Sequence, residues 1–363
     1  MDIELVTDVD RLQEFVDGWE ALADLTAQPR CGGALVVGWA RHMMGPGSEL
    51  RVWVATDGDD VVGVLPFAAE TMARGRLRLL PTTTDMMYGM VPIAHPDRAP
   101  DVADAIAGQF AEGAEAVDLA SIFWLPEGSP WAAAFGGRLA EPDWVTMNMT
   151  RYSSFYTNIG DGIEAWLDRR HTEFRRTVRR RARRCEEQGF RRWTTVDPVE
   201  IMDRLPHLQS FYVRRQQERG GEGYRFDEDM VAAIGASIAL SPPGRFALSI
   251  LESDELVIGT QLVQRAGNRM SCWITGYDPE WSKVGPGIAA LVEALDAGSQ
   301  AGCEIADLGV GDQPYKDDLQ DAAFELESVT WCRPRLARLL QLGAEAPPGG
   351  STAQVGDADG SGA

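Results

Sequence analysis

A Gly-Pro-Gly sequence at 285–287 opens an expected helix in the C-terminal third of the chain. The helix is predicted by apolar residues at helical spacing, namely Ile288, Leu291, Val292 and Leu295. The first N–H groups of a helix lack partners within it and carry partial positive charge, and small residues there let an anion approach. We therefore predict a phosphate-binding loop made of Gly285, Pro286, Gly287 and Ile288. An ordinary glycine turn before a core helix would have the same pattern.

The segment from Asp307 to Lys316 is the second candidate for chemistry, because a carboxylate, a tyrosine and a lysine flank a loop that contains two glycines. Acyl transfer from a thioester needs a polarised carbonyl oxygen and an acceptor that loses a proton, and a proton on the leaving thiolate helps. Asp307 is predicted to accept a proton or to orient Lys316. Tyr315 is predicted to protonate the thiolate, and Lys316 to stabilise the oxyanion or to bind phosphate.

Each of these three residues also has a structural interpretation. Asp307 would cap the following loop through backbone N–H groups, Tyr315 would anchor the loop, and Lys316 would be an exposed cation. The chain has four histidines and lacks a Ser-His-Asp or Cys-His signature, which favours direct transfer without a covalent intermediate on the protein. Its five cysteines are scattered and include no C-x-x-C pair, so we expect free thiols and no metal site.

Several motifs together resemble those of one family. Tyr-Asp-Pro at 277–279, Pro-Gly at the start of a helix and Asp-Leu-Gly-x-Gly-x-x-x-Tyr-Lys at 307–316 resemble the second half of certain GNAT-superfamily acyltransferases. The group in question contains the cellulose-biosynthesis acetyltransferases and the FemAB-like enzymes. The Arg-rich segment 171–190 and Val-Val-Gly-Val-Leu-Pro-Phe at 61–67 are similar to further parts of the family, so the resemblance covers residues 30–335. It implies a GNAT-type N-acetyltransferase with acetyl-CoA or another acyl-CoA as co-substrate.

The resemblance also implies where the acceptor binds. Asp85 and Tyr88 fall where the family places a loop that faces the cleft, and Tyr277 begins the donor loop. In the Arg-rich segment, Arg175 and Arg179 are our candidates for lining a groove that holds the phosphates of a cofactor or of a nucleotide-linked sugar. The alternative is a solvated charged face whose arginine stems pack over apolar neighbours.

An internal repeat indicates the architecture. Residues 54–64 and 250–260 superpose at a constant offset, each as strand, acidic turn and strand, and Gly63 matches Gly259. Two unrelated hairpins would look alike as well. We predict an α/β fold of two GNAT-like domains in tandem, with mixed central sheets flanked by helices. Residues 1–150 would form a degenerate N-terminal domain, 151–343 a C-terminal domain with the donor site, and 344–363 a disordered tail.

Composition limits the partners. The net charge of −21 argues against general binding of nucleic acid or of anionic membranes. No apolar run approaches the length of a transmembrane helix, and the N-terminus lacks a signal-peptide pattern, so we expect a cytoplasmic protein. The predicted function is acyl transfer from acyl-CoA to an amine or hydroxyl of a sugar or cell-envelope precursor. The alternatives are a FemAB-like aminoacyl transferase that uses aminoacyl-tRNA, and a non-catalytic binding protein with the same fold.

Overall fold

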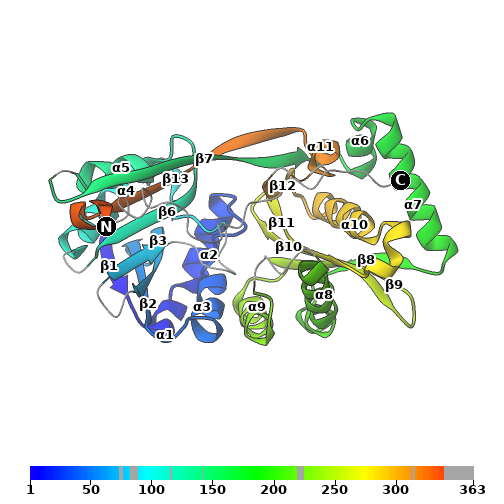
Figure 1. The fold of residues 1–363 in the computed structure, drawn as a ribbon, viewed down its shortest axis with the longest axis horizontal. Coiled ribbons are helices and arrows are strands. Elements are labelled where there is room, and N and C mark those ends of the chain that lie inside the picture. Colours follow the sequence, from blue (N-terminus) through cyan, green and yellow to red (C-terminus); the bar gives the residue numbers. More distant parts are fainter. Residues whose placement is uncertain are drawn as a thin grey trace.

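The computed structural model describes residues 1–72, 77–81, 89–114, 117–140, 142–218, 225–311, 313 and 315–338. Two of the predicted acceptor residues, Asp85 and Tyr88, lie outside this part of the chain, and so does the predicted tail. The described residues form one 13-stranded mixed sheet with helices on its faces, which confirms the α/β class (Figure 1). In this part of the chain, no helix is long and apolar enough to cross a membrane.

The N-terminal half supplies the first seven strands and the helices between them. Its elements are β1 (Asp2–Val6), α1 (Val9–Gln13), α2 (Val16–Leu25), α3 (Gly33–His42), β2 (Ser48–Asp57), β3 (Asp60–Met72), β4 (Leu77–Pro81), β5 (Ile93–Ala94), η2 (Pro96–Arg98), α4 (Ala99–Glu112), β6 (Leu119–Pro126), α5 (Pro130–Arg138) and β7 (Val145–Asn158). The helical spacing of apolar residues from Leu12 to Leu22 predicts a helix-rich opening over residues 3–27, but Asp2–Val6 form strand β1. Its backbone pairs instead with the outer edge of β2.

The C-terminal half repeats this order. Its elements are α6 (Ile163–Asp168), α7 (Thr172–Glu187), β8 (Arg191–Thr195), α8 (Pro198–Glu218), α9 (Glu228–Leu240), β9 (Phe246–Glu252), β10 (Val257–Ala266), β11 (Arg269–Tyr277), η4 (Pro279–Val284), α10 (Pro286–Gln300), β12 (Ile305–Val310), α11 (Tyr315–Leu319) and β13 (Ala322–Cys332). Strands β1-β2-β3-β4-β6 in the first half correspond to β8-β9-β10-β11-β12 in the second.

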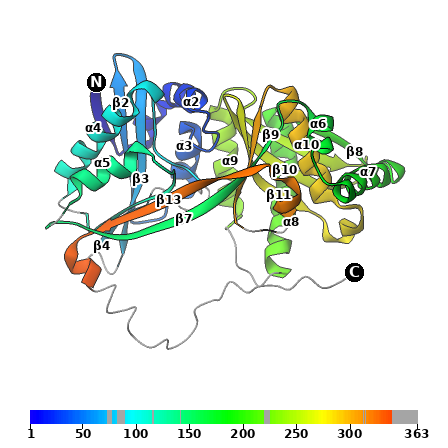
Figure 2. The same cartoon turned by 90° about the horizontal axis from the view of Figure 1, so that it is seen from above.

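The two halves exchange their last strands. The sheet order is β1-β2-β3-β4-β6-β13-β7-β12-β11-β10-β9-β8, so β7 of the first half pairs with β12 and β13 of the second half pairs with β6. Strands β7 and β13 also pair with each other along most of their length and cross the molecule from one half to the other (Figure 2). The expected domain boundary at residue 150 falls inside β7.

The repeat predicted from the hairpins is confirmed at the level of single residues. The β2–β3 register shifts around Val62 and the β9–β10 register shifts around Ile258, which is the same repeat position. The carbonyl of Val62 accepts a hydrogen bond from His95 N at 2.8 Å, and that of Ile258 accepts one from Asp278 N at 2.9 Å. Two unrelated hairpins would not be expected to have a β-bulge at the same position and also a hydrogen bond to the carbonyl of the bulged residue.

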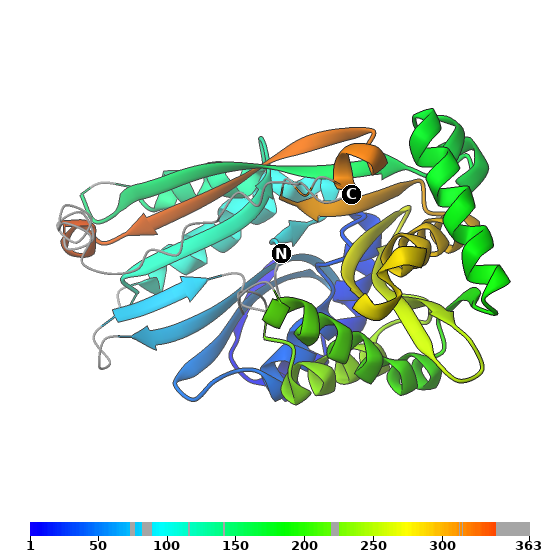
Figure 3. The same ribbon diagram turned by 45° about the vertical axis from the view of Figure 1, so that its right-hand side comes forward.

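Helices cover both faces of each half. In the C-terminal half, α10 packs on β8–β11 from one face, while α8 packs on β10 and β11 from the other (Figure 3). Helix α3 of the first half packs on α9 of the second so closely that a Cβ at Gly38 would lie 2.4 Å from the carbonyl oxygen of Ala233. The halves are therefore joined by helix packing as well as by the exchanged strands, and the side chains between them line the site described next.

Candidate active site

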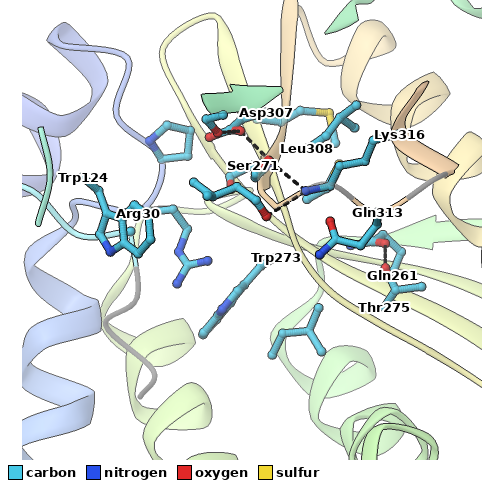
Figure 4. Close-up of a pocket in the computed structure, with 18 of the residues that line it drawn as sticks. Arg30, Trp124, Gln261, Ser271, Trp273, Thr275, Asp307, Leu308, Gln313 and Lys316 are labelled. Atoms are coloured by element: carbon cyan, nitrogen blue, oxygen red, sulfur yellow. Dashed lines mark hydrogen bonds between the residues drawn. The ribbon is translucent and has the colours of Figure 1, made fainter. Parts of the chain in front are cut away.

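A cavity opens where two parallel strands of the C-terminal half part. Strands β11 and β12 pair only from Arg269 to Ser271 with Ile305 to Asp307, and β11 then continues to Tyr277 without this neighbour. The cavity has a volume of about 560 Å³. It is lined from β11, β12, α8 and α10, and also from the N-terminal half through Arg30 and Trp124 (Figure 4). Cavities of this size commonly hold small-molecule ligands.

Asp307 lines this cavity from the last paired position of β12. Its Oδ1 accepts hydrogen bonds from Ser154 Oγ at 3.0 Å and from Gly309 N at 2.8 Å. Burial raises the pKa of the Asp307 carboxyl above its ordinary range, although those two hydrogen bonds and the charges of Arg269 and Arg30 act in the opposite direction. A carboxylate with a raised pKa is suited to accept a proton near neutral pH. The contact with Gly309 N–H is the loop cap of the structural interpretation. The role of Asp307 as a proton acceptor stays a prediction.

Lys316 is buried and holds the glycine loop. Its Nζ donates hydrogen bonds to the carbonyl oxygens of Gly309, Val310 and Gly311 at 2.9, 2.9 and 3.1 Å. An ammonium group has three N–H donors, so these carbonyls match all of them. The interpretation as an exposed cation is wrong, since the residue is 3% exposed. In this geometry Lys316 holds the loop that follows Asp307 in place. The predicted contact of Lys316 with an oxyanion would require some of these hydrogen bonds to break.

Tyr315 directly precedes Lys316 in the sequence and is 41% exposed. It lines the cavity together with Gln313 and Asp307. Its predicted role as proton donor to a leaving thiolate in the cavity stays a prediction. Cys272 also lines the cavity, and burial together with the nearby charge of Asp307 raises the pKa of its thiol. A protonated thiol is a poor nucleophile, which agrees with direct transfer.

The predicted phosphate loop forms the start of α10. Gly285 has a φ of 70°, a left-handed conformation that favours glycine, and α10 begins at Pro286 with no side-chain cap. Arg181 of α7 lies against Gly285, because a Cβ there would be 2.5 Å from Arg181 Cδ. The start of this 15-residue helix therefore combines uncapped N–H groups with an adjacent guanidinium.

A short series of contacts connects this helix start with the cavity. A Cβ at Gly287 would lie 2.9 Å from Tyr277 Cδ1, so the Tyr277 ring covers the first turn of α10. The Arg215 guanidinium lies 5.7 Å from the centre of the same ring, and Arg215 lines the cavity. Leu291, one turn further along α10, lines it too. Gly285, Pro286, Gly287 and Ile288 thus lie beside the cavity rather than in its wall.

The two arginines chosen from the Arg-rich segment do not line the cavity. Arg175 contacts Asp168 Oδ1 at 3.3 Å and Thr172 Oγ1 at 3.4 Å, and Arg179 contacts Glu164 Oε2 at 3.0 Å. These contacts hold the two arginines against α6 and the first turn of α7. Their binding of substrate stays a prediction, while Arg181 is the arginine of this helix that lies at the donor loop.

Sequence reasoning missed two residues of the N-terminal half that line the cavity, Arg30 and Trp124. Arg30 follows α2, and its guanidinium lies 4.4 Å from the centre of the Trp273 ring on β11 (Figure 4). Trp124 on β6 has a φ of 64°, which is unusual for an aromatic residue, and its ring lies 4.6 Å from that of Tyr152. No local motif marks either residue. The unusual φ of Trp124 is a structural signal that sequence does not carry.

Comparisons with known proteins agree with this geometry. Residues 172–317 match the sequence model of the family described as Acetyltransferase (GNAT) domain. Among solved structures, FemX shares the fold with a TM-score of 0.61 at 12% identity, over 94% of this chain and 99% of that one. The C-terminal domain (DUF2156) of a putative lysylphosphatidylglycerol synthetase from Agrobacterium fabrum has a TM-score of 0.56 at 12% identity, over 92% of this chain and 96% of that one. No curated protein sequence matches the chain.

The matched segment contains the predicted phosphate loop, Asp307, Tyr315 and Lys316. The C-terminal half therefore contains a segment that matches the GNAT acetyltransferase domain, and the described residues have an α/β architecture of two similar units. Within the residues that the structure describes, no group of three or more His, Cys, Asp and Glu side chains is arranged to hold a metal ion.

Proposed function

We propose that the protein transfers an acyl group directly from acyl-CoA, with acetyl-CoA as the first donor to test, to an amine or hydroxyl of a small acceptor in the cavity. The supporting observation is the position of Asp307, whose carboxyl lines the cavity where β11 and β12 part, next to the uncapped start of α10. The C-terminal half, from α6 to β13, would hold the donor, and the N-terminal half, from β1 to β7, would help to shape the acceptor site.

The donor fits the residues at the start of α10. Its pyrophosphate would be held by the N–H groups of Gly287 and Ile288 and by the Arg181 guanidinium. Its thioester would then enter the cavity beyond Tyr277. In this proposal, the acceptor attacks the thioester carbonyl carbon while its proton passes to Asp307. The C–S bond then breaks, and the leaving thiolate takes a proton from Tyr315.

The test is calorimetric titration of acetyl-CoA, followed by measurement of free CoA release with a panel of amines, amino sugars and nucleotide-linked sugars. Gly287→Glu places a carboxylate beside the same N–H groups, so acetyl-CoA affinity should fall roughly tenfold or more, or about 1.4 kcal/mol. Gly287→Ala is the control, because it adds the Cβ that crowds the Tyr277 ring but adds no carboxylate. Unchanged affinity in a folded Gly287→Glu variant would place the donor elsewhere.

Aminoacyl-tRNA is the second candidate donor, and one observation favours it. Helix α7 carries exposed arginines beside the donor loop, namely Arg176, Arg179, Arg180, Arg183 and Arg184. Such a basic surface can bind RNA locally even though the whole chain is acidic. Retention of aminoacyl-tRNA but not of acetyl-CoA on the purified protein, with strong salt dependence, would support this candidate.

A further inference from the structure

The loop that carries Arg30 is held in place by buried groups of the N-terminal half. The thiol of Cys31 is buried and accepts a hydrogen bond from Val91 N at 3.4 Å, while Cys31 N donates to Gln28 O at 3.0 Å. Gly32, two residues after Arg30, leaves room for the buried carboxylate of Glu20. Oε1 of Glu20 accepts a hydrogen bond from Ala34 N at 3.0 Å. The backbone at Arg30 is therefore fixed before any ligand arrives.

The Arg30 side chain crosses from this loop to the C-terminal half. Its guanidinium lies 4.4 Å from the centre of the Trp273 ring, and it lines the same cavity as Asp307 (Figure 4). A second cavity cation, Arg269, lies with Cζ 5.7 Å from the centre of the Phe324 ring. A guanidinium that packs over an aromatic ring is partly pre-organised and so loses less freedom on binding.

The cavity thus combines one carboxylate with two cations held on aromatic rings. All three groups line the cavity, and the charges of Arg269 and Arg30 both favour the ionised form of Asp307. Aromatic side chains from both halves complete the wall, namely Trp124, Tyr212, Phe226, Trp273 and Phe324. An acceptor that complements these groups carries a nucleophile whose proton Asp307 can accept. It also carries an anionic group that the arginines can bind, and an apolar or aromatic body.

We propose that Arg30 and Arg269 bind an anionic group of the acceptor, a carboxylate or a phosphate, and so direct its nucleophile to Asp307. This inference rests on the proposed acyl transfer and names the class of acceptor, a compact amine or alcohol with a negative charge. The N-terminal half then determines specificity through Arg30, while the C-terminal half carries the donor and the proton acceptor.

The experiment compares pairs of probes that differ only in the anionic group. N-acetylphenylalanine and N-acetylphenylalaninamide represent a carboxylate product and its neutral partner, and phenyl phosphate and phenol represent a phosphate and its neutral partner. Binding to the full chain is measured by calorimetry without any donor. We expect the anionic member of at least one pair to bind about tenfold more tightly or better. In Arg30→Gln the difference should fall at least threefold, and Arg30→Lys should restore part of it.

The matched control is Arg41→Gln, because Arg41 belongs to the same half but contacts Asp10 and Gln13 outside the cavity. This variant should keep the full preference for the anionic probes, and thermal melts establish that each variant is folded. The proposal is overturned if neither anionic probe binds better than its neutral partner, or if the preference survives in Arg30→Gln. Because no donor is present, failure of acyl transfer and failure of this inference give different results.

Discussion

The hydroxyl of Ser154 donates a hydrogen bond of 3.0 Å to Oδ1 of Asp307. Ser154 belongs to β7, the strand that the N-terminal half contributes to the sheet of the C-terminal half. The strand exchange therefore has a direct chemical consequence, since it places a hydrogen-bond donor of one repeat on the carboxylate of the other. With Gly309 N–H on the same oxygen, the orientation of the Asp307 carboxyl is determined by the fold.

Asp307→Asn should lower the rate of acyl transfer by about 10²–10⁴-fold and leave acetyl-CoA affinity unchanged, because the amide cannot accept the acceptor's proton. Burial raises the pKa of Asp307, and only the ionised form is a base. The wild-type rate should therefore rise with pH through this raised pKa and then level off. The variant should lack this limb, and initial rates measured across a pH series check both statements.

Ser154→Ala is the companion variant for Asp307, since it removes a hydrogen bond that favours the ionised carboxyl. Its loss should raise the pKa of Asp307 further, so the acidic limb of the rate profile should move to higher pH while the plateau rate changes little. An unchanged profile in both variants would assign Asp307 to loop capping alone.

Tyr315→Phe removes only a hydroxyl, so donor binding should persist while the catalytic rate falls by about 10²–10⁴-fold. The matched control is Tyr156→Phe. Tyr156 packs on the cavity residue Phe324, with ring centres 5.9 Å apart, but does not itself line the cavity. Steady-state kinetics with saturating acetyl-CoA separate the two variants. Equal rates in Tyr315→Phe and wild type would make Tyr315 a structural anchor.

Lys316→Met should destabilise the fold more than it alters the chemistry directly. The substitution leaves the carbonyls of Gly309, Val310 and Gly311 without their shared donor, at a position that is 3% exposed. We expect the free energy of unfolding to fall by about 1–3 kcal/mol, measured by chemical denaturation. Lys283→Met, at an exposed position on η4, should change it by less than about 0.5 kcal/mol. A fully stable but inactive Lys316→Met would favour the predicted oxyanion role.

The features that sequence could predict are local ones. The repeat of Gly63 at Gly259 was visible because both glycines sit under the helix that follows, where a Cβ would lie 2.1 Å from Val102 Cγ1 and 2.9 Å from Pro286 O. The start of α10 was visible because Gly285, Pro286 and the apolar spacing after them each act within a few residues. Asp307 and Tyr315 belong to one short sequence motif, so their prediction as site residues also depends on neighbouring residues alone.

The features that sequence could not predict depend on contacts between distant segments. The exchange of β7 and β13 leaves the secondary-structure propensity of both segments unchanged. The sequence therefore gives no reason against a domain boundary at residue 150, although this residue lies within β7. Arg30 is 243 residues from its ring partner Trp273, since 273 − 30 = 243. Lys316 looked like an exposed cation because its three acceptors are backbone carbonyls, which a sequence does not distinguish.

Arg181 and Arg175 differ in their distance from the predicted phosphate loop, and only Arg175 was singled out from the sequence. Arg181 lies against Gly285, whereas Arg175 contacts Asp168 and Thr172. Arg181→Gln should therefore weaken acetyl-CoA binding about three- to tenfold, or about 0.6–1.4 kcal/mol, because it removes a charge beside the donor's phosphates. Arg175→Gln should leave the affinity within about twofold.

Calorimetric titrations at two salt concentrations provide the measurement for this pair. An interaction between Arg181 and phosphate weakens as salt screens it, so the difference between wild type and Arg181→Gln should shrink at high ionic strength. Because both side chains lie on the surface of one helix, the melting temperatures of the two variants should stay close to that of the wild type. If Arg175→Gln loses the larger part of the affinity, the phosphates lie along the N-terminal part of α7 and not at the start of α10.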